Sequence, residues 1–436
     1  MSNNFIYLQT LSSRIASNAK KRAPFRLALK IYLLFFITFA LAPVKSVFPF
    51  DWAAASFFGI TVIFAFFGMK AAALRFGGGN NNLPSLVNFK LLSKVIIIIS
   101  TVGIALTLTD RFIIRGVDFS QNAMEARSAI ADAGSGVIGI LAAFFSSFAA
   151  FGVISVWLAE SASNKKNIKF SILAHINLIL YVYLSIMLGS RSLLLVVFLT
   201  HISARFLMTI KTNNGKKIRF FTLALFSGLS VLTALVLIFE SRLEIMGLSA
   251  KDSIQLSAYA YTLTPTESVL NFIEGNIFLE TFGAAAYSLV LYAYHGMFEF
   301  FYLFNNLGSN HTYGSITFWL PLKIFETTFG SVDSVDLESI SGYRLGVFTS
   351  FFGPLFLDFS LFAPIAAFFI FFFLSLPNYL VARGKCQWVF FVIIAETVII
   401  FSPAMSLVQS ASGMYLVVAA ACIAVFAPKI KTGLNA

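Results

Sequence analysis

Long runs of apolar residues divide this chain, and they constrain its fold more than any other feature. About ten such runs can be marked, at 27–42, 52–69, 91–109, 136–159, 170–188, 193–210, 220–239, 346–376, 388–403 and 414–427. A helix needs roughly 20 mostly apolar residues to cross the hydrocarbon core of a bilayer. The runs are continuous and do not alternate with polar residues, which excludes barrel strands. We therefore predict an all-α polytopic membrane protein with about ten transmembrane helices.

The composition and the placement of charge support this class. Of the 436 residues, 58% are hydrophobic and 11% are charged, so a water-soluble fold would expose large apolar patches. The net charge of +12 is gathered in clusters that all fall on one side if every run crosses once. This pattern follows the positive-inside rule, so it predicts two cytoplasmic termini and no nucleic-acid partner. The clusters lie at 20–22, 70–94, 165–166, 211–219, 383–385 and 429–431.

The same topology predicts five parts of the chain. They are a basic cytoplasmic segment at 1–26, transmembrane helices 1–7 at 27–239, a long outer loop at 240–345, helices 8–10 at 346–427, and a cytoplasmic tail at 428–436. We expect the basic residues of the first segment to lie against lipid headgroups. The first apolar run lacks a cleavage pattern, which predicts a retained anchor. Cys386 falls near a cytoplasmic loop and Cys422 inside a late helix, so we predict no disulfide and no metal cluster. We also predict no cofactor.

The outer loop contains the residues best suited to chemistry. Residues 284–304 are apolar, but a further crossing there would reverse every later basic cluster, so we expect a helix at the outer interface. In helical register Tyr292, His295, Glu299 and Tyr302 share one face. A histidine oriented by a carboxylate can act as a general base for a sugar hydroxyl. The alternative is a pair that only satisfies two polar groups, and His311 in a nearby turn has the same two interpretations.

Three arginines are predicted at the outer membrane surface. Arg191 lies in the short GSRS turn at 189–192, Arg242 follows the seventh run, and Arg344 precedes the eighth. Together they would suit a lipid-linked diphosphate, because a guanidinium grips phosphate with two hydrogen bonds. Arg191 would otherwise extend to lipid phosphates.

Two acidic residues fall inside apolar runs. Asp358 lies between Gly353-Pro354 and Pro364, where we expect a broken helix, and Glu396 is isolated in the ninth run. An intramembrane carboxylate is a functional candidate by default, although either residue could instead pair inside the bundle.

The layout and several short motifs resemble the Wzy-type O-antigen polymerases. The likeness covers roughly 181–376 and is carried by the GSR turn, the Tyr-x-x-His-Gly-x-x-Glu run from Tyr292 to Glu299, and the YRLGVFTSFFGPLFLDFS segment at 343–360. The resemblance implies a GT-C-like glycosyltransferase of the bacterial inner membrane with a periplasmic site. Such an enzyme moves a growing glycan from undecaprenyl diphosphate to the non-reducing end of a new lipid-linked repeat unit, with no metal or nucleotide sugar.

Carried onto this sequence, the resemblance implies that Arg191, Arg242 and Arg344 hold the donor diphosphate. It implies that His295, assisted by Glu299, activates the acceptor. Its partners would be the lipid-linked oligosaccharide, membrane lipid, and a chain-length regulator and flippase of the same pathway. One departure is Ser360, where many relatives have glycine after Asp-Phe.

Two other functions stay open from the sequence. A flippase for the same lipid-linked oligosaccharide would line a cavity through the bundle with charged residues, and this chain has few of these but one very long outer loop. An O-antigen ligase would share the mechanism and differ only in its acceptor.

Overall fold

The computed structural model describes residues 3–77, 87–117, 136–187, 191–209, 222, 225–237, 247, 249–255, 257–274, 280–308, 311–330, 340, 342–344, 347 and 349–427. These residues are mostly helical, and six helices are long and apolar enough to cross a membrane: Pro24–Leu41, Trp52–Phe76, Phe89–Ile114, Val137–Ser163, Ile168–Ile186 and Phe352–Ala382. Four shorter apolar helices span Ser192–Met208, Leu225–Leu237, Cys386–Phe401 and Ser412–Phe426. Each of the ten predicted runs therefore overlaps a helix, and the chain is an all-α polytopic membrane protein. The number of crossings stays a prediction.

The elements follow one another along the chain with few strands. The α-helices are α1 (Asn3–Lys21), α2 (Pro24–Leu41), α3 (Trp52–Phe76), α4 (Phe89–Leu108), α6 (Val137–Ser147), α7 (Ala149–Ser163), α8 (Ile168–Met187), α9 (Arg191–Thr209), α11 (Ala250–Gln255), α12 (Glu267–Glu274), α13 (Glu280–Asn306), α14 (Trp319–Phe329), α15 (Phe352–Phe359), α16 (Ala363–Ala382), α17 (Val389–Phe401) and α18 (Ala411–Phe426). A π-helix, η1 (Thr109–Ile114), extends α4, and three 3₁₀ turns are η2 (Ala258–Tyr261), η4 (Ser360–Phe362) and η5 (Cys386–Trp388). The strands β1 (Val44–Ser46) and β2 (Leu263–Pro265) pair antiparallel.

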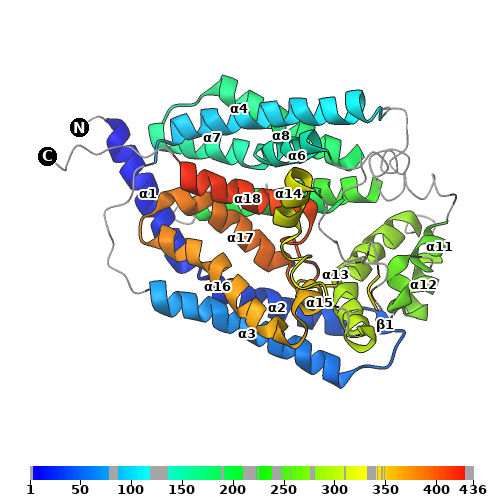
Figure 1. Ribbon diagram of the computed structural model, residues 1–436. Coiled ribbons are helices and arrows are strands. Elements are labelled where there is room, and N and C mark those ends of the chain that lie inside the picture. Colours follow the sequence, from blue (N-terminus) through cyan, green and yellow to red (C-terminus); the bar gives the residue numbers. More distant parts are fainter. Residues whose placement is uncertain are drawn as a thin grey trace.

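The long helices lie side by side, as Figure 1 shows, with α4, α7 and α8 on one side of α17 and α18 and with α2, α3 and α16 on the other. Small residues let these helices approach closely. A Cβ on Gly68 of α3 would collide with the backbone carbonyl of Phe368 on α16, and one on Gly103 of α4 would collide with the backbone of Ser146 on α6. Outward-facing apolar side chains such as Leu74 and Ile113 are left exposed for lipid to cover.

The first helix, α1, lies at one end of the bundle and packs into it (Figure 1). Its buried face includes Ile15 and Asn18, and the Asn18 amide donates to the Leu207 carbonyl at 2.6 Å. Arg22, just after α1, forms an ion pair with Glu396 of α17 at 3.0 Å. Arg22 therefore does not lie against lipid headgroups, and Glu396 pairs inside the bundle, which is the alternative that the sequence left open. Pairing a buried carboxylate costs less than leaving it alone in the bundle, and Arg22 supplies the partner.

The expected break in the eighth run is confirmed. Helix α15 ends at Phe359, and α16 begins at Ala363 after the turn η4. Ser360 adopts a φ of 49°, which is in the left-handed region that favours glycine. The chain thus changes direction at the residue where the resembled family has glycine.

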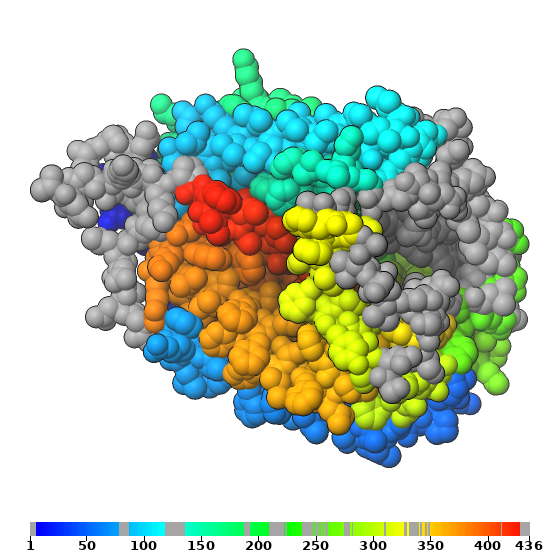
Figure 2. Space-filling model, viewed as in Figure 1, coloured from blue at the N-terminus to red at the C-terminus, as the bar shows by residue number. Residues whose placement is uncertain are grey.

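Helix α13 lies at the opposite end of the bundle from α1, together with α11, α12 and β1 (Figure 1). It has 27 residues and is not among the candidate spans, and its position at the outer interface stays a prediction. Its aromatic side chains pack on the ends of α2 and α3: the Tyr294 ring lies 5.2 Å from that of Phe35, and the Phe300 ring lies 5.3 Å from that of Phe58. On the face drawn in Figure 2, α14 (yellow) lies against α18 (red), where the Trp319 and Tyr415 rings are 6.0 Å apart.

Candidate functional site

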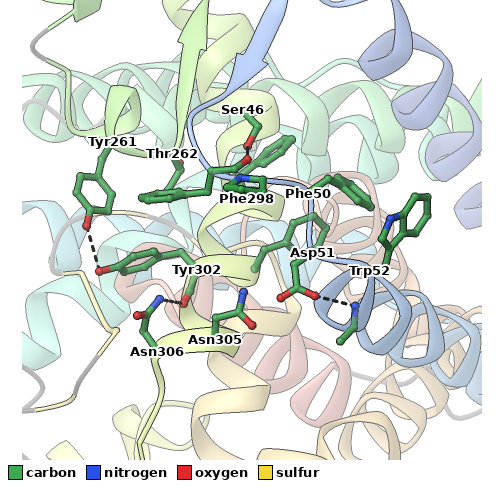
Figure 3. A pocket seen from close by; sticks show the side chains of 14 residues that line it. Ser46, Phe50, Asp51, Trp52, Tyr261, Thr262, Phe298, Tyr302, Asn305 and Asn306 are labelled. Carbon is green, nitrogen blue, oxygen red and sulfur yellow. Dashed lines mark hydrogen bonds between the residues drawn. The ribbon is translucent and has the colours of Figure 1, made fainter.

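An open cleft of about 760 Å³ lies beside α13, at the end of the bundle opposite α1, which we call the outer end after the predicted topology. This volume is within the range of small-molecule sites. Figure 3 shows the cleft from close by, with aromatic rings and polar side chains converging on it. Its lining consists of Ser46, Phe48, Pro49, Phe50, Asp51, Trp52, Ala53, Tyr261, Thr262, Phe298, Phe301, Tyr302, Asn305 and Asn306.

Two short strands bring the walls of the cleft together. β1 follows α2, and β2 belongs to the long outer loop; Ser46 pairs with Leu263, and the Val47 N–H donates to the Thr262 carbonyl at 3.1 Å. Beyond β1, Asp51 caps α3 by accepting from the Ala53 N–H at 2.7 Å. The loop between α2 and α3 is thereby fixed against residues more than 200 positions later in the sequence.

A buried ion pair lies at the edge of this cleft. The Arg344 guanidinium donates to Glu299 Oε1 at 2.7 Å, and the Thr262 hydroxyl donates to the same oxygen at 2.8 Å. Glu299 is only 1% exposed. Arg344 lies over the ring of Tyr261 at 4.2 Å, and the Tyr261 hydroxyl donates to the Tyr302 hydroxyl at 3.2 Å. Burial raises the pKa of Glu299, while the Arg344 charge and the Thr262 hydrogen bond oppose that rise.

His295 lies one helical turn before Glu299 and is fully buried. Its Nδ1 is 3.0 Å from the Leu291 carbonyl, and its ring is 5.7 Å from the ring of Tyr292. Burial lowers the pKa of His295 to about 4, and the positive charge of Arg344 adds to the effect, so the imidazole is neutral at pH 7. The structure therefore brings His295, Glu299 and Arg344 together. His295 is not part of the cleft lining.

Two predicted arginines lack a described side chain. Arg191 is the first residue of α9, and its side chain lies outside the described residues. Arg242 also lies outside them. The predicted pocket of three arginines is thus described only at Arg344, and the other two positions stay predictions.

Asp358 anchors the turn that follows His311. Its carboxylate accepts from the backbone N–H groups of Gly314 at 3.1 Å and Thr317 at 2.7 Å, and also from the Thr312 hydroxyl. The carboxylate is 2% exposed, so these bonds replace its lost hydration. The structure gives Asp358 a positioning role for this turn.

Within the described residues, His311 Nδ1 is buried without a hydrogen-bond partner.

A second cavity, of about 310 Å³, lies between α4, α6, α8, α9 and α18. Asp110 and Arg111, on η1, line it with Tyr181. Asp110 pairs with Arg115 at 3.0 Å, and Arg111 donates to the Leu184 carbonyl at 2.6 Å. This cavity could not be predicted from the sequence, because a π-helix at the end of a span has no recognisable sequence pattern.

The sequence analysis also missed the cleft residues of the first outer loop. The PFDW sequence at 49–52 contains two exposed aromatic residues, Phe50 and Trp52, around Asp51. Aromatic residues at a membrane interface are common, so this signal did not stand out. Within the described part of the chain, no group of three or more His, Cys, Asp or Glu residues could hold a metal ion.

No protein-family model, no curated protein and no solved structure matches this chain.

Proposed function

We propose that this chain is a glycosyltransferase of the bacterial inner membrane, of the Wzy type. It would transfer a growing glycan from undecaprenyl diphosphate to a new lipid-linked repeat unit at the periplasmic face. One observation carries the proposal: a solvent-open cleft with aromatic and amide side chains lies at the outer end of a membrane bundle and borders the buried Glu299–Arg344 pair. Charged groups that are fixed in position and partly shielded from water can stabilise the charge that develops on a leaving group.

The proposed step forms one bond and breaks one. A hydroxyl oxygen of the acceptor sugar attacks the anomeric carbon of the donor, and the bond from that carbon to the diphosphate oxygen breaks. The diphosphate leaves with the bonding electron pair, and the hydroxyl proton passes to a base. The positive charge of Arg344 would stabilise the leaving group, and Glu299 would hold the guanidinium in place through its 2.7 Å contact.

The base in this proposal is His295, the residue predicted from the sequence. Its neutral imidazole can accept a proton at pH 7, since its pKa lies near 4. Its burial requires that neighbouring residues move before a hydroxyl reaches it. The role of His295 therefore stays a prediction that a variant must test.

A transporter of the same lipid is the second candidate. The second cavity favours it, because Asp110 and Arg111 place charge between helices of the bundle, as a pathway for a polar headgroup requires. The ligase alternative shares the chemistry of the first proposal and differs in its acceptor.

The test uses purified protein in liposomes with undecaprenyl-diphosphate-linked repeat units of its own host. Wild-type protein should give a ladder of multiples, and Glu299→Gln should reduce it strongly. Glu280→Gln is a matched control, because Glu280 is an exposed carboxylate in the first turn of the same helix. If wild-type protein gives no ladder but moves the lipid across the bilayer, the transporter replaces the polymerase. If the glycan is added only to a supplied lipid A core, the ligase replaces it.

A further inference from the structure

We infer that the cleft beside α13 binds the sugar portion of the substrate, and that it selects uncharged or amino sugars over acidic sugars. This inference rests on the proposed function for the identity of the ligand as a glycan. It adds that the lining of the cleft contacts the sugar, while the diphosphate lies toward Arg344 at the edge of the cleft.

The aromatic lining offers flat apolar faces. Trp52 is 77% exposed, and its ring lies 4.8 Å from that of Phe50. On the other wall the rings of Phe48 and Tyr302 are stacked at 5.7 Å with an angle of 29° between their planes. A pyranose ring has one face formed by C–H groups, and such a face packs on an aromatic ring with little loss of hydration. Phe298 and Phe301 of α13 also line the cleft, and both are largely buried.

The polar lining offers partners for hydroxyl groups. Asp51, Asn305 and Asn306 project from two different elements into the same cleft (Figure 3). An amide both donates and accepts, and a carboxylate accepts from two hydroxyls, which is the combination that a vicinal diol needs. Asn306 already donates to the Tyr302 carbonyl at 2.8 Å, which fixes the direction of its side chain.

The charge of the lining determines which sugars fit. Among the fourteen lining residues Asp51 is the only one with a formal charge. The Ala54 N–H, with Asn305, holds the pKa of Asp51 below its ordinary value, so its carboxylate is ionised at neutral pH. Arg344, the nearby cation, is in contact with Glu299. A uronic acid on the aromatic lining would therefore meet the negative charge of Asp51, while the charge of Arg344 at the edge is balanced by Glu299.

The expected discrimination is modest and depends on salt. A ligand carboxylate about 7 Å from Asp51 in water-like surroundings should bind about threefold more weakly than its neutral counterpart. Because both charges are exposed to solvent, the difference should shrink at high ionic strength. Loss of the Trp52 ring should weaken every sugar about fivefold, which is the size of a stacking contact.

The experiment measures binding of single sugars to the full chain in nanodiscs of uncharged lipid, by saturation-transfer NMR titration. The probes are methyl glucoside, N-acetylglucosamine, glucosamine and glucuronate, at low and at high salt. We expect glucuronate to be the weakest ligand at low salt. Asp51→Asn should raise glucuronate to the level of methyl glucoside, and Trp52→Ala should weaken all four.

Two features make the variants interpretable. Asparagine caps a helix as well as aspartate does, so Asp51→Asn keeps the start of α3. Phe329→Ala removes an aromatic ring that is 74% exposed on α14 and outside the cleft lining, and it should change no affinity.

Three results would overturn the inference: no probe binds, Trp52→Ala leaves binding unchanged, or wild-type protein binds glucuronate as tightly as methyl glucoside at low salt. The ladder assay separates this inference from the proposed function. A ladder without selective binding in the cleft removes only the inference. Selective binding without a ladder removes the polymerase and leaves a sugar-binding cleft.

Discussion

Two buried glutamate–arginine pairs lie at opposite ends of this bundle, and they invite comparison. In the outer pair Glu299 is 1% exposed and its oxygen is 2.7 Å from Arg344; in the inner pair the Glu396 side chain is 4% exposed and lies 3.0 Å from Arg22. The two arginine side chains are exposed to a similar extent, 22% for Arg344 and 19% for Arg22. Each pair joins a glutamate on a helix to an arginine from a distant part of the chain.

Their surroundings differ. The outer pair borders an open cleft and has a threonine hydroxyl and a tyrosine ring as neighbours. The inner pair is enclosed by helices: Arg22 also donates to the Ser203 carbonyl at 3.2 Å, and neither Arg22 nor Glu396 lines either of the two cavities described above. A buried ion pair alone therefore does not identify a site, since it can equally hold helices together.

The largest effect is expected from breaking the inner pair. Arg22→Ala would leave Glu396 buried without its partner, which should lower the free energy of unfolding by about 3–5 kcal/mol. Thermal unfolding in detergent and the yield of folded protein measure this loss. Lys21→Ala is the control, because Lys21, the last residue of α1, is exposed and adjacent to Arg22 in the sequence. Equal unfolding temperatures for the two variants would contradict the assignment of Arg22 as a structural anchor.

Breaking the outer pair should lower the rate of polymerisation. Arg344→Gln should lower polymerisation about hundredfold, the cost of losing one group that stabilises a leaving-group charge. The polymerisation rate of Arg344→Lys should lie between those of wild-type protein and Arg344→Gln, because lysine keeps the charge but lacks the planar guanidinium. Arg75→Gln, at an exposed arginine near the inner end of α3, should have no effect. The ladder assay with quantified chain lengths measures these rates.

Double variants sharpen the contrast between the two ends. Arg344→Gln with Glu299→Gln removes the unpaired buried charge, so stability should return while polymerisation stays low. Arg22→Met with Glu396→Gln should restore both stability and polymerisation. If the outer double variant were active, the outer pair would be structural like the inner one.

The free energy of unfolding should depend on pH through His295. Its pKa in the folded protein is near 4, below its value of about 6.5 in an unfolded chain, so the unfolded state binds more protons between these values. Stability should therefore fall as the pH drops from 6.5 toward 4, by about 2 kcal/mol at pH 5. Glu299, with its raised pKa, acts in the opposite direction, since a raised carboxyl pKa favours the folded state at low pH.

The His295 contribution is isolated by difference. His295→Gln keeps Glu299, so the stability of wild-type protein minus that of the variant, measured from pH 7.5 to 5, reports the histidine alone. A flat difference would show that His295 is as accessible to protons in the folded chain as in the unfolded one.

The sequence predicts local features of both ends better than contacts between distant segments. Helix positions followed from apolar runs because a span is a local feature of about 20 residues. His295 and Glu299 could be placed on one face of a helix for the same reason. The cleft could not be predicted, because its walls meet through two strands of three residues each, too short for a pattern. Nor could the pairing of Arg22 with Glu396, which is set by packing between segments far apart in the chain.

The smallest effect concerns the outer end again, at Ser360. This serine has a φ of 49° and a ψ of −129°, a conformation that is costly for any residue with a Cβ. Ser360→Gly should remove that cost, and the greater freedom of glycine in the unfolded chain offsets part of the gain. We expect a net increase of about 1 kcal/mol in the free energy of unfolding.

A second serine supplies the control for this prediction. Ser171→Gly, within α8, should lower the free energy of unfolding by about 0.5–1 kcal/mol, because glycine inside a helix is unfavourable. Opposite signs for the two changes in chemical denaturation would place backbone strain at the break between α15 and α16. A loss of stability in Ser360→Gly would mean that the serine side chain contributes more there than its backbone conformation costs. If the stabilised variant also polymerised more slowly, the backbone strain at Ser360 would contribute to activity at the outer end. The inner end, held by α1, would then differ by contributing to stability alone.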